Sequence, residues 1–305
     1  MNAISIQAVN KTYESKTVAL DNVSLEVTDG EVFGLVGPDG AGKSTLFNIL
    51  TTLLLPDSGT LTVFGMDVIR DYKAVRQVIG YLPGTFSLYP DLSVEENLTF
   101  FAVMYKSSID DNMDLIRPIW NQLSPFKNRK AGKLSGGMKQ KLALCCALIH
   151  RPRILFLDEP TTGVDPVSRK EFWDILKSIR HEGITVVVST PYMDEATRCD
   201  RIALIQDGRI IGINPPGTFI QNFKGKLFTF RCDNIFALLP AMERCPLNCN
   251  YYPYGDNCHI AFYDSLDTAL PTFEKFLQDN GLRHETLVAI NPSVEDCFIE
   301  IVKMK

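Results

Sequence analysis

The chain has 305 residues, of which 45% are hydrophobic and 22% charged, so it can form one large globular domain or two unequal ones. Its formal net charge is −5, and neither half is basic: residues 1–217 carry 23 Lys and Arg against 25 Asp and Glu, and residues 218–305 carry 8 against 11. Because phosphate-backbone binding needs clustered basic side chains, this balance argues against nucleic acid as a partner.

The termini and the apolar runs give no sign of export or of membrane insertion. The start, MNAISIQAVNKTY, has no basic segment followed by an apolar core, so we expect no signal peptide. The longest strictly apolar run, LALCCALI at 142–149, is far shorter than the roughly 18 residues of a membrane span, so another chain would have to cross any membrane. We therefore expect the eight cysteines to be reduced; a structural metal at Cys245, Cys249, Cys258 and His259 is the less favoured alternative.

The first chemically informative segment is EVFGLVGPDGAGKSTLFNIL at 31–50. Residues 32–36 predict a buried parallel strand, and the apolar spacing over 46–54 predicts a helix. Between them, residues 37–44 fit the pattern G-x-x-x-x-G-K-[ST], whose backbone N–H groups close around phosphates at the positive end of the helix. Lys43 would reach the terminal phosphates and the Ser44 hydroxyl would bind Mg²⁺. The alternative is a glycine-rich turn without a ligand.

Two further helix starts follow. Ser93 and Glu96, three residues apart, predict a capped helix within PDLSVEENLTFFAVMY at 90–105. Ser135 predicts the start of another helix, within KLSGGMKQKLALCCALIH at 133–150, whose apolar positions share one stripe. Because Gly136 and Gly137 leave the backbone accessible there, this helix start is a second candidate anion site.

The segment RILFLDEP at 153–160 predicts an apolar strand that ends in two acids. At that position Asp158 would hold Mg²⁺ through water, and Glu159 would polarise the attacking water. The alternative is a strand capped by two solvated acids, and the phosphate loop upstream makes the catalytic interpretation the stronger one.

Taken together, residues 1–217 resemble the ATP-binding subunits of ABC transporters. GPDGAGKST resembles the Walker A loop, ILFLDE the Walker B strand, LSGGM the signature and GVDP at 163–166 the D-loop. The resemblance implies an α/β P-loop NTPase fold, with a RecA-like core, an antiparallel β subdomain and a helical subdomain at about 86–150. It implies that Tyr13 stacks on adenine, and that the nucleotide is bound by Gly37, Pro38, Asp39, Gly40, Ala41, Gly42, Lys43, Ser44, Thr45, Ser135, Gly136 and Gly137.

The resemblance also implies cofactors and partners. In this family two such domains pack head to tail, and each ATP, with Mg²⁺, lies between one phosphate loop and the signature serine of the other domain. We therefore expect a second ATP-binding subunit, identical or different, and membrane-spanning permease subunits that hold the chain on the cytoplasmic, inner face of the membrane. The segment from Pro191 to Gly212 and the end at 292–303 resemble exporter-type subunits for drugs or polysaccharides. The alternatives are a soluble ABC-type mechanoenzyme on ribosomes or DNA, and a degenerate nucleotide-binding subunit with little hydrolysis.

Two positions depart from the family pattern. Gly84 stands where the family has a Gln that touches Mg²⁺ and water, and Pro191 stands where it has a His that contacts the γ-phosphate. Losing one such donor can cost on the order of 10²–10³ in rate, so we expect slow hydrolysis unless Thr190 or a partner group supplies the contact. Beside Gly84, the side chains of Phe86, Leu88 and Tyr89 are candidate contacts to the membrane partner, with core packing as the alternative.

After residues 214–219 the sequence changes character. Alternating strand-like and helical segments in the order β-α-β-β-α-β predict a small α+β accessory domain at 218–305. No catalytic constellation is present there, so we expect a role in interaction or dimer support.

Overall fold

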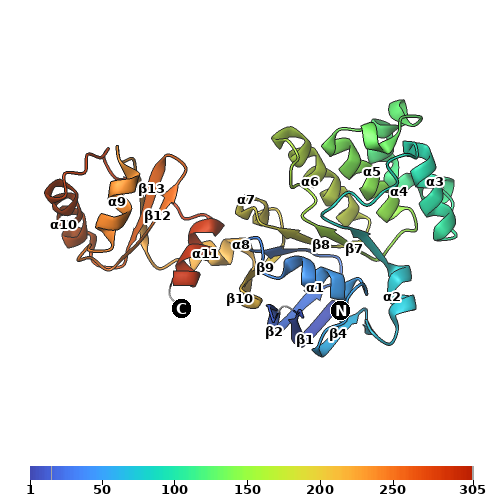
Figure 1. Cartoon of the computed structure of the whole chain (residues 1–305), viewed down its shortest axis with the longest axis horizontal. Coiled ribbons are helices and arrows are strands. Elements are labelled where there is room, and N and C mark those ends of the chain that lie inside the picture. Colours follow the sequence, from blue (N-terminus) through green and yellow to red (C-terminus); the bar gives the residue numbers. More distant parts are fainter. Residues whose placement is uncertain (15, 304–305) are drawn as a thin grey trace. The chain divides into compact units, whose positions relative to one another are not determined.

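The computed structural model describes residues 1–14 and 16–303, and the chain divides into two compact units, Met1–Pro216 and Gly217–Lys305 (Figure 1). Among the described residues, no helix combines the length and the apolar character that crossing a membrane requires.

The first unit is built on a six-stranded sheet in which five strands are parallel and the edge strand β10 is antiparallel. Strands β3, β7 and β8 are buried along their whole length, as expected for parallel strands that are covered on both faces. Their carboxyl ends therefore lie together at one edge of the sheet. The strands, in their order across the sheet, are β10 (Arg209–Asn214), β9 (Arg201–Gln206), β3 (Val32–Val36), β8 (Thr185–Thr190), β7 (Ile154–Asp158) and β6 (Ile79–Leu82).

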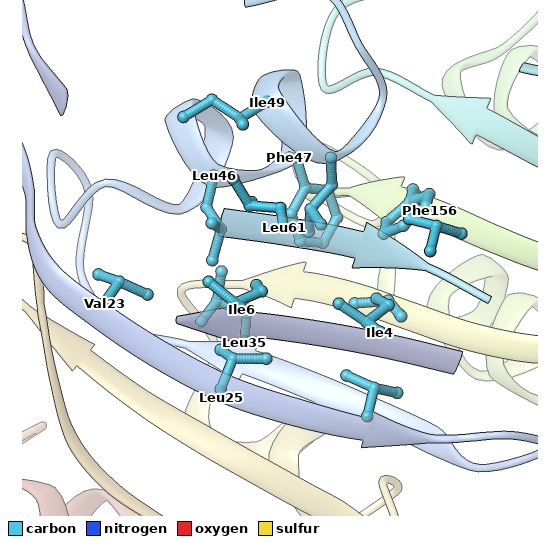
Figure 2. Packing of buried hydrophobic residues seen from close by; sticks show 14 of the residues in the cluster. Ile4, Ile6, Val23, Leu25, Leu35, Leu46, Phe47, Ile49, Leu61 and Phe156 are labelled. Atoms are coloured by element: carbon cyan, nitrogen blue, oxygen red, sulfur yellow. The ribbon is translucent and has the colours of Figure 1, made fainter. Parts of the chain in front are cut away.

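A second, antiparallel sheet packs across helix α1 (Lys43–Leu50). Leu46 and Phe47 on this helix belong to one buried core with side chains of both sheets, and the Phe47 ring meets the edge of Phe156 at a centroid distance of 5.7 Å (Figure 2). Because this core holds the helix from both sides, it also fixes the loop in front of it. The antiparallel strands, in order, are β2 (Val18–Thr28), β1 (Asn2–Thr12), β4 (Ser58–Val63) and β5 (Met66–Asp67).

In the helical part of this unit, two helices begin where the sequence predicts. Ser93 and Glu96 form a reciprocal capping box at the start of α3, and the Ser135 hydroxyl accepts a hydrogen bond from the Met138 N–H at the start of α5. The apolar stripe of α5 is buried against α3 and α4. The helices of the unit are α2 (Tyr72–Val78), α3 (Val94–Met104), α4 (Met113–Leu123), α5 (Gly136–Leu148), α6 (Pro166–His181), α7 (Met193–Ala196) and α8 (Pro216–Gln221, across the boundary), with short 3₁₀ turns at Asp110–Asn112, Ser124–Phe126 and Ala131–Lys133.

The second unit is a four-stranded antiparallel sheet with the predicted β-α-β-β-α-β order and one further helix. One face of the sheet packs against α9 and α10 through a core of Phe and Leu side chains. The strands, in order across the sheet, are β12 (Cys249–Tyr254), β13 (Asn257–Phe262), β11 (Lys226–Phe230) and β14 (Val288–Ala289), and the helices are α9 (Ile235–Met242), α10 (Leu266–Asp279) and α11 (Val294–Lys303).

Helix α11 contacts the opposite face of this sheet through two buried carboxylates. Asp296, only 1% exposed, accepts hydrogen bonds from the hydroxyl of Tyr252 and from the backbone and hydroxyl of Ser293, and pairs with His259 Nδ1 at 2.8 Å. These bonds outweigh the effect of burial and hold the pKa of Asp296 below its ordinary value. The carboxylate of Glu300 accepts the N–H groups of residues 224 and 225 and the hydroxyl of Tyr263.

The candidate metal ligands of the second unit do not converge. Cys258 packs into the core on the α9 and α10 face, whereas the neighbouring His259 bonds to Asp296 on the other face. Within the described parts of the chain, no group of three or more His, Cys, Asp or Glu side chains is placed to hold a metal ion.

Candidate active site

The phosphate loop connects β3 to α1, and its glycines are required by space as well as by conformation. A Cβ on Gly37 would lie 2.2 Å from the carbonyl oxygen of Ile205, and one on Gly42 would lie 2.3 Å from that of Ala19. Gly42, the N-cap of α1, also has a φ of 102°, which favours glycine. The first N–H groups of a helix have no intrahelical partner, so this tight turn presents donors at the positive end of α1.

These donors face a cavity of about 260 Å³. Tyr13, at its mouth, is 41% exposed, and its hydroxyl lies 3.2 Å from the Thr45 hydroxyl. The structure thus brings together the ring of Tyr13 and the phosphate loop, which are predicted to bind the same nucleotide. The lining residues are Tyr13, Thr17, Val18, Ala19, Gly40, Gly42, Lys43, Ser44, Thr45 and Glu159.

Lys43 carries the central positive charge of the cavity. Its side chain is 3% exposed, and Nζ donates to the carbonyl oxygens of Gly37 at 2.8 Å and Pro38 at 2.9 Å. The same ammonium forms an ion pair with Glu159 Oε1 at 3.2 Å, while Asp39, 3.8 Å away, is 88% exposed and mainly solvated. An anion that enters the cavity must therefore compete with Glu159 for Lys43.

Asp158 and Glu159 are held by the neighbouring strand β8. The Ser189 hydroxyl donates to Asp158 Oδ1, and the N–H of Glu159 donates to the backbone oxygen and hydroxyl oxygen of Ser189 at 3.1 and 3.0 Å. Glu159 has a φ of 47°, a left-handed conformation that costs roughly 1–3 kcal/mol in a non-glycine residue and that these contacts offset.

Burial and the nearby charge of Asp158 raise the pKa of Tyr81 on β6. Ser189 went unrecognised in the sequence, where the only signal was a polar residue inside the apolar run VVVST.

Position 84 faces the Asp158 carboxylate. A Cβ on Gly84 would lie 3.2 Å from the backbone oxygen of Asp158 and 4.0 Å from its Oδ2. A side chain at this position would thus extend beside the acid that is predicted to hold Mg²⁺, and glycine provides none.

Thr190 does not point a free donor into the cavity. Its side chain is 1% exposed, its hydroxyl donates to Glu195 Oε2 at 2.7 Å, and the same oxygen accepts the N–H of Tyr192 at 3.1 Å. The suggestion that Thr190 replaces the donor missing at Pro191 is therefore wrong for this arrangement, because its only proton is already used.

The signature residues lie apart from the cavity. Ser135 and Gly136 are exposed at the start of α5, and a Cβ on Gly137 would lie 3.0 Å from the Ser168 hydroxyl of α6. Among the described residues that line the cavity, none belongs to this segment. Within one copy of the chain, the two predicted halves of the nucleotide site, the phosphate-loop cavity and the signature segment, therefore lie apart.

Of the three candidate coupling residues, the structure exposes two. Leu88 is only 7% exposed, so for this residue the alternative of core packing holds. Phe86 and Tyr89 are 38% and 47% exposed.

Comparison with known proteins gives consistent matches. Residues 20–162 match the family model described as ABC transporter. The chain is 39% identical over 306 residues to Nod factor export ATP-binding protein I of Burkholderia thailandensis, covering 98% of this chain and 96% of that protein. It is 44% identical over 201 residues to the probable multidrug ABC transporter ATP-binding protein YbhF of Escherichia coli K12, covering 65% of this chain but only 35% of that longer protein.

Solved structures agree with these matches. The dimeric post-hydrolysis structure of the ATP-binding cassette MJ0796 with ADP and Pi has a TM-score of 0.63 at 29% identity, over 70% of this chain and 98% of that one. CbiO1 of Clostridium perfringens, part of the ABC transporter complex cbiONQ, has a TM-score of 0.65 at 27% identity, over 72% and 91%. The predicted family and the predicted P-loop NTPase fold are thereby confirmed: the chain belongs to the ABC transporter family, as one of its ATP-binding subunits.

Proposed function

We propose that the protein is the ATP-hydrolysing motor of a multi-chain exporter and acts on the cytoplasmic face of the membrane through separate permease subunits. The observation that carries the proposal is the convergence of Lys43, Asp158 and Glu159 at the carboxyl edge of the parallel sheet, next to the N-terminus of α1. The names of the two relatives, which refer to Nod factor export and to multidrug transport, support export as the direction.

The residues of the cavity suit ATP and Mg²⁺. The glycine cradle and Lys43 offer N–H and ammonium donors to phosphate oxygens, and the hydroxyl of Ser44 and the carboxylate of Asp158 are oxygen ligands of the kind that Mg²⁺ prefers. When bound, Mg²⁺ would neutralise negative charge on the terminal phosphates. The terminal phosphates would displace Glu159 from Lys43, and the released carboxylate can then accept a proton from the attacking water.

Replacing Lys43→Ala should weaken ATP binding roughly 10- to 100-fold, because a charge-assisted contact to the phosphates is lost. Isothermal calorimetry measures the Kd directly. Lys177→Ala, which removes an exposed lysine from α6, is the matched control and should bind ATP as the wild type does. An unchanged Kd in the Lys43 variant would remove the phosphate-loop assignment.

The separation of Ser135 from the cavity supports a second subunit that completes the site. With Glu159→Gln, ATP should bind without being hydrolysed, and the chain should accumulate as a dimer that light scattering detects. Adding Ser135→Arg should abolish this dimer by blocking the opposing phosphates, whereas adding Thr272→Arg, on the exposed face of α10, should not. Monomers alone in the Glu159→Gln variant would contradict the homodimer and favour a different partner subunit.

Gly84 and Pro191 support slow turnover, since the site keeps its charged groups but has no side-chain donor at either position. Hydrolysis should depend on Mg²⁺ and should be abolished by Glu159→Gln. Pro191→His should raise kcat up to about 100-fold by restoring one donor.

Steady-state phosphate release checks this prediction, with Pro191→Ala as the control that frees the backbone without adding a donor. If the His and Ala variants turn over equally fast, the missing contact is supplied by another group.

An exposed apolar face on α3 supports the permease as partner. Phe100, Val103 and Met104 are 40%, 71% and 51% exposed, and the Tyr89 ring meets the edge of Phe100 at 4.8 Å. We call these four side chains the α3 face. Of these four, Tyr89 lies on the segment that begins at Gly84, where a Cβ would be 3.2 Å from the backbone oxygen of Asp158, so a partner bound at Tyr89 would contact the chain segment that passes Asp158.

The variant Val103→Asp should release the chain from detergent-solubilised membranes, because it places a charge within the α3 face. The measurement is the fraction of tagged chain that co-purifies with a multi-span membrane protein identified by mass spectrometry. Ile69→Asp, at another exposed apolar position, is the control. Equal recovery of both variants would place the docking surface elsewhere.

A further inference from the structure

We propose that Glu195 is a positioning residue for ATP hydrolysis: its buried carboxylate joins the end of β8 to the loop that follows Glu159 and so fixes the catalytic carboxylate. The proposal rests on the hydrolytic function of Glu159 proposed above.

Glu195 lies on the short helix α7 and is 1% exposed. Its Oε2 accepts the hydroxyl of Thr190 at 2.7 Å, and its Oε1 accepts the hydroxyl of Thr161 at 2.8 Å. Both threonines are themselves 1% exposed. One side chain thus connects two segments that are far apart in sequence and adjacent at the carboxyl edge of the sheet.

A third contact makes this buried charge stable. Arg169 of α6 donates to Glu195 Oε1 from Nε at 3.2 Å and from Nη2 at 3.0 Å. Partial burial by itself would lower the pKa of Arg169, but its hydrogen bond to Glu195 and the charges of Glu195 and Asp194 raise it above the ordinary value. The guanidinium also lies 4.5 Å from the ring centre of Tyr192, next to Pro191.

The position of Glu159 depends on both of its flanks. On one side, its N–H is fixed by Ser189 of β8. On the other side, the loop turns back through hydrogen bonds from Thr162 N–H to Glu159 O and from Val164 N–H to Thr161 O, and the side chain of Thr161 ties this turn to Glu195. Because Glu159 has a left-handed φ, its side-chain direction relies on this support.

Pro191 increases the importance of this link. Its side chain has no polar atom, so it cannot connect the turn after β8 to the reacting groups. In the described structure, the turn is instead held to the loop of Glu159 by the hydroxyls of Thr190 and Thr161 on the shared carboxylate of Glu195. A misplacement of about 1 Å in a catalytic group can cost on the order of 10² in rate, which is the scale of effect that losing this link can produce.

The test uses threonine variants that keep their shape, since replacing Glu195 itself would also remove the hydrogen bonds of Arg169 and so change more than the link between the two threonines. Thr161→Val removes the hydroxyl, and Thr161→Ser keeps it. For Thr161→Val we expect kcat to fall at least about tenfold while the Kd for ATP stays within about twofold, and for Thr161→Ser we expect kcat to be largely restored.

Thr190→Val and Thr190→Ser form a second matched pair with the same expectation. In the double variant Thr161→Val with Thr190→Val, kcat should fall by less than the product of the two single effects, because both hydroxyls act through one carboxylate. Thr272→Val on α10 is the control and should leave kcat unchanged.

A purely structural role would lower thermal stability, ATP affinity and kcat together, and serine would not rescue kcat selectively; that pattern overturns the proposal. An unchanged kcat in Thr161→Val also overturns it. If the wild type shows no Glu159-dependent hydrolysis at all, the proposed function fails first and the positioning role fails with it.

Discussion

The arrangement of the site depends on the register of three buried parallel strands. Val36 of β3 pairs with Thr190 of β8, and Asp158 of β7 pairs with Ser189 of β8, so the three strands end at nearly the same level. The phosphate loop, the two acids and the turn at Pro191 therefore emerge side by side. A shift of one residue of β7 against β8 would turn every side chain of the shifted strand to the other face and move Asp158 away from Ser189.

Within this frame, most polar groups at the strand ends are already paired with one another. Lys43 is shared between two backbone carbonyls and Glu159, Asp158 accepts from Ser189, and Thr190 donates to Glu195. The Lys43–Glu159 pair must open when a phosphate enters, but the other contacts can stay in place when charge develops, and such preorganisation is a major source of enzymatic rate enhancement. The two positions without a polar side chain, 84 and 191, lie at the same edge of the sheet, and the proposed slow turnover follows from that combination.

The sequence predicts the features that depend on local chemistry. The strand before the phosphate loop, the glycines at 37 and 42, the caps at Ser93 and Ser135 and the alternation of the second unit are all present as expected. Each of these features is determined within a few residues, by the spacing of apolar residues, by a capping residue or by a glycine.

The features that the sequence does not predict depend on contacts between distant segments. Ser189 bonds to Asp158 across 31 residues and Glu195 bonds to Thr161 across 34, and no local pattern shows that these side chains are buried. Leu88 is another such case, because its burial depends on the packing of the loop around it. In the same way, the pairing of His259 with Asp296 across 37 residues explains a histidine that the spacing of nearby cysteines had suggested as a metal ligand.

Such long-range pairing makes helix α11 necessary for the stability of the second unit. Its two acids, Asp296 and Glu300, are the acceptors for groups on the second sheet and on the segment before it, including Tyr252, His259 and Tyr263. Trimming the chain at residue 292 would remove the charged acceptors of these donors and expose the sheet face that α11 covers, at a cost of about 1.5–3 kcal/mol for each hydrogen bond to a carboxylate. Residues 293–303 are therefore an integral part of the second unit, and expression boundaries or cleavable fusions belong beyond this helix.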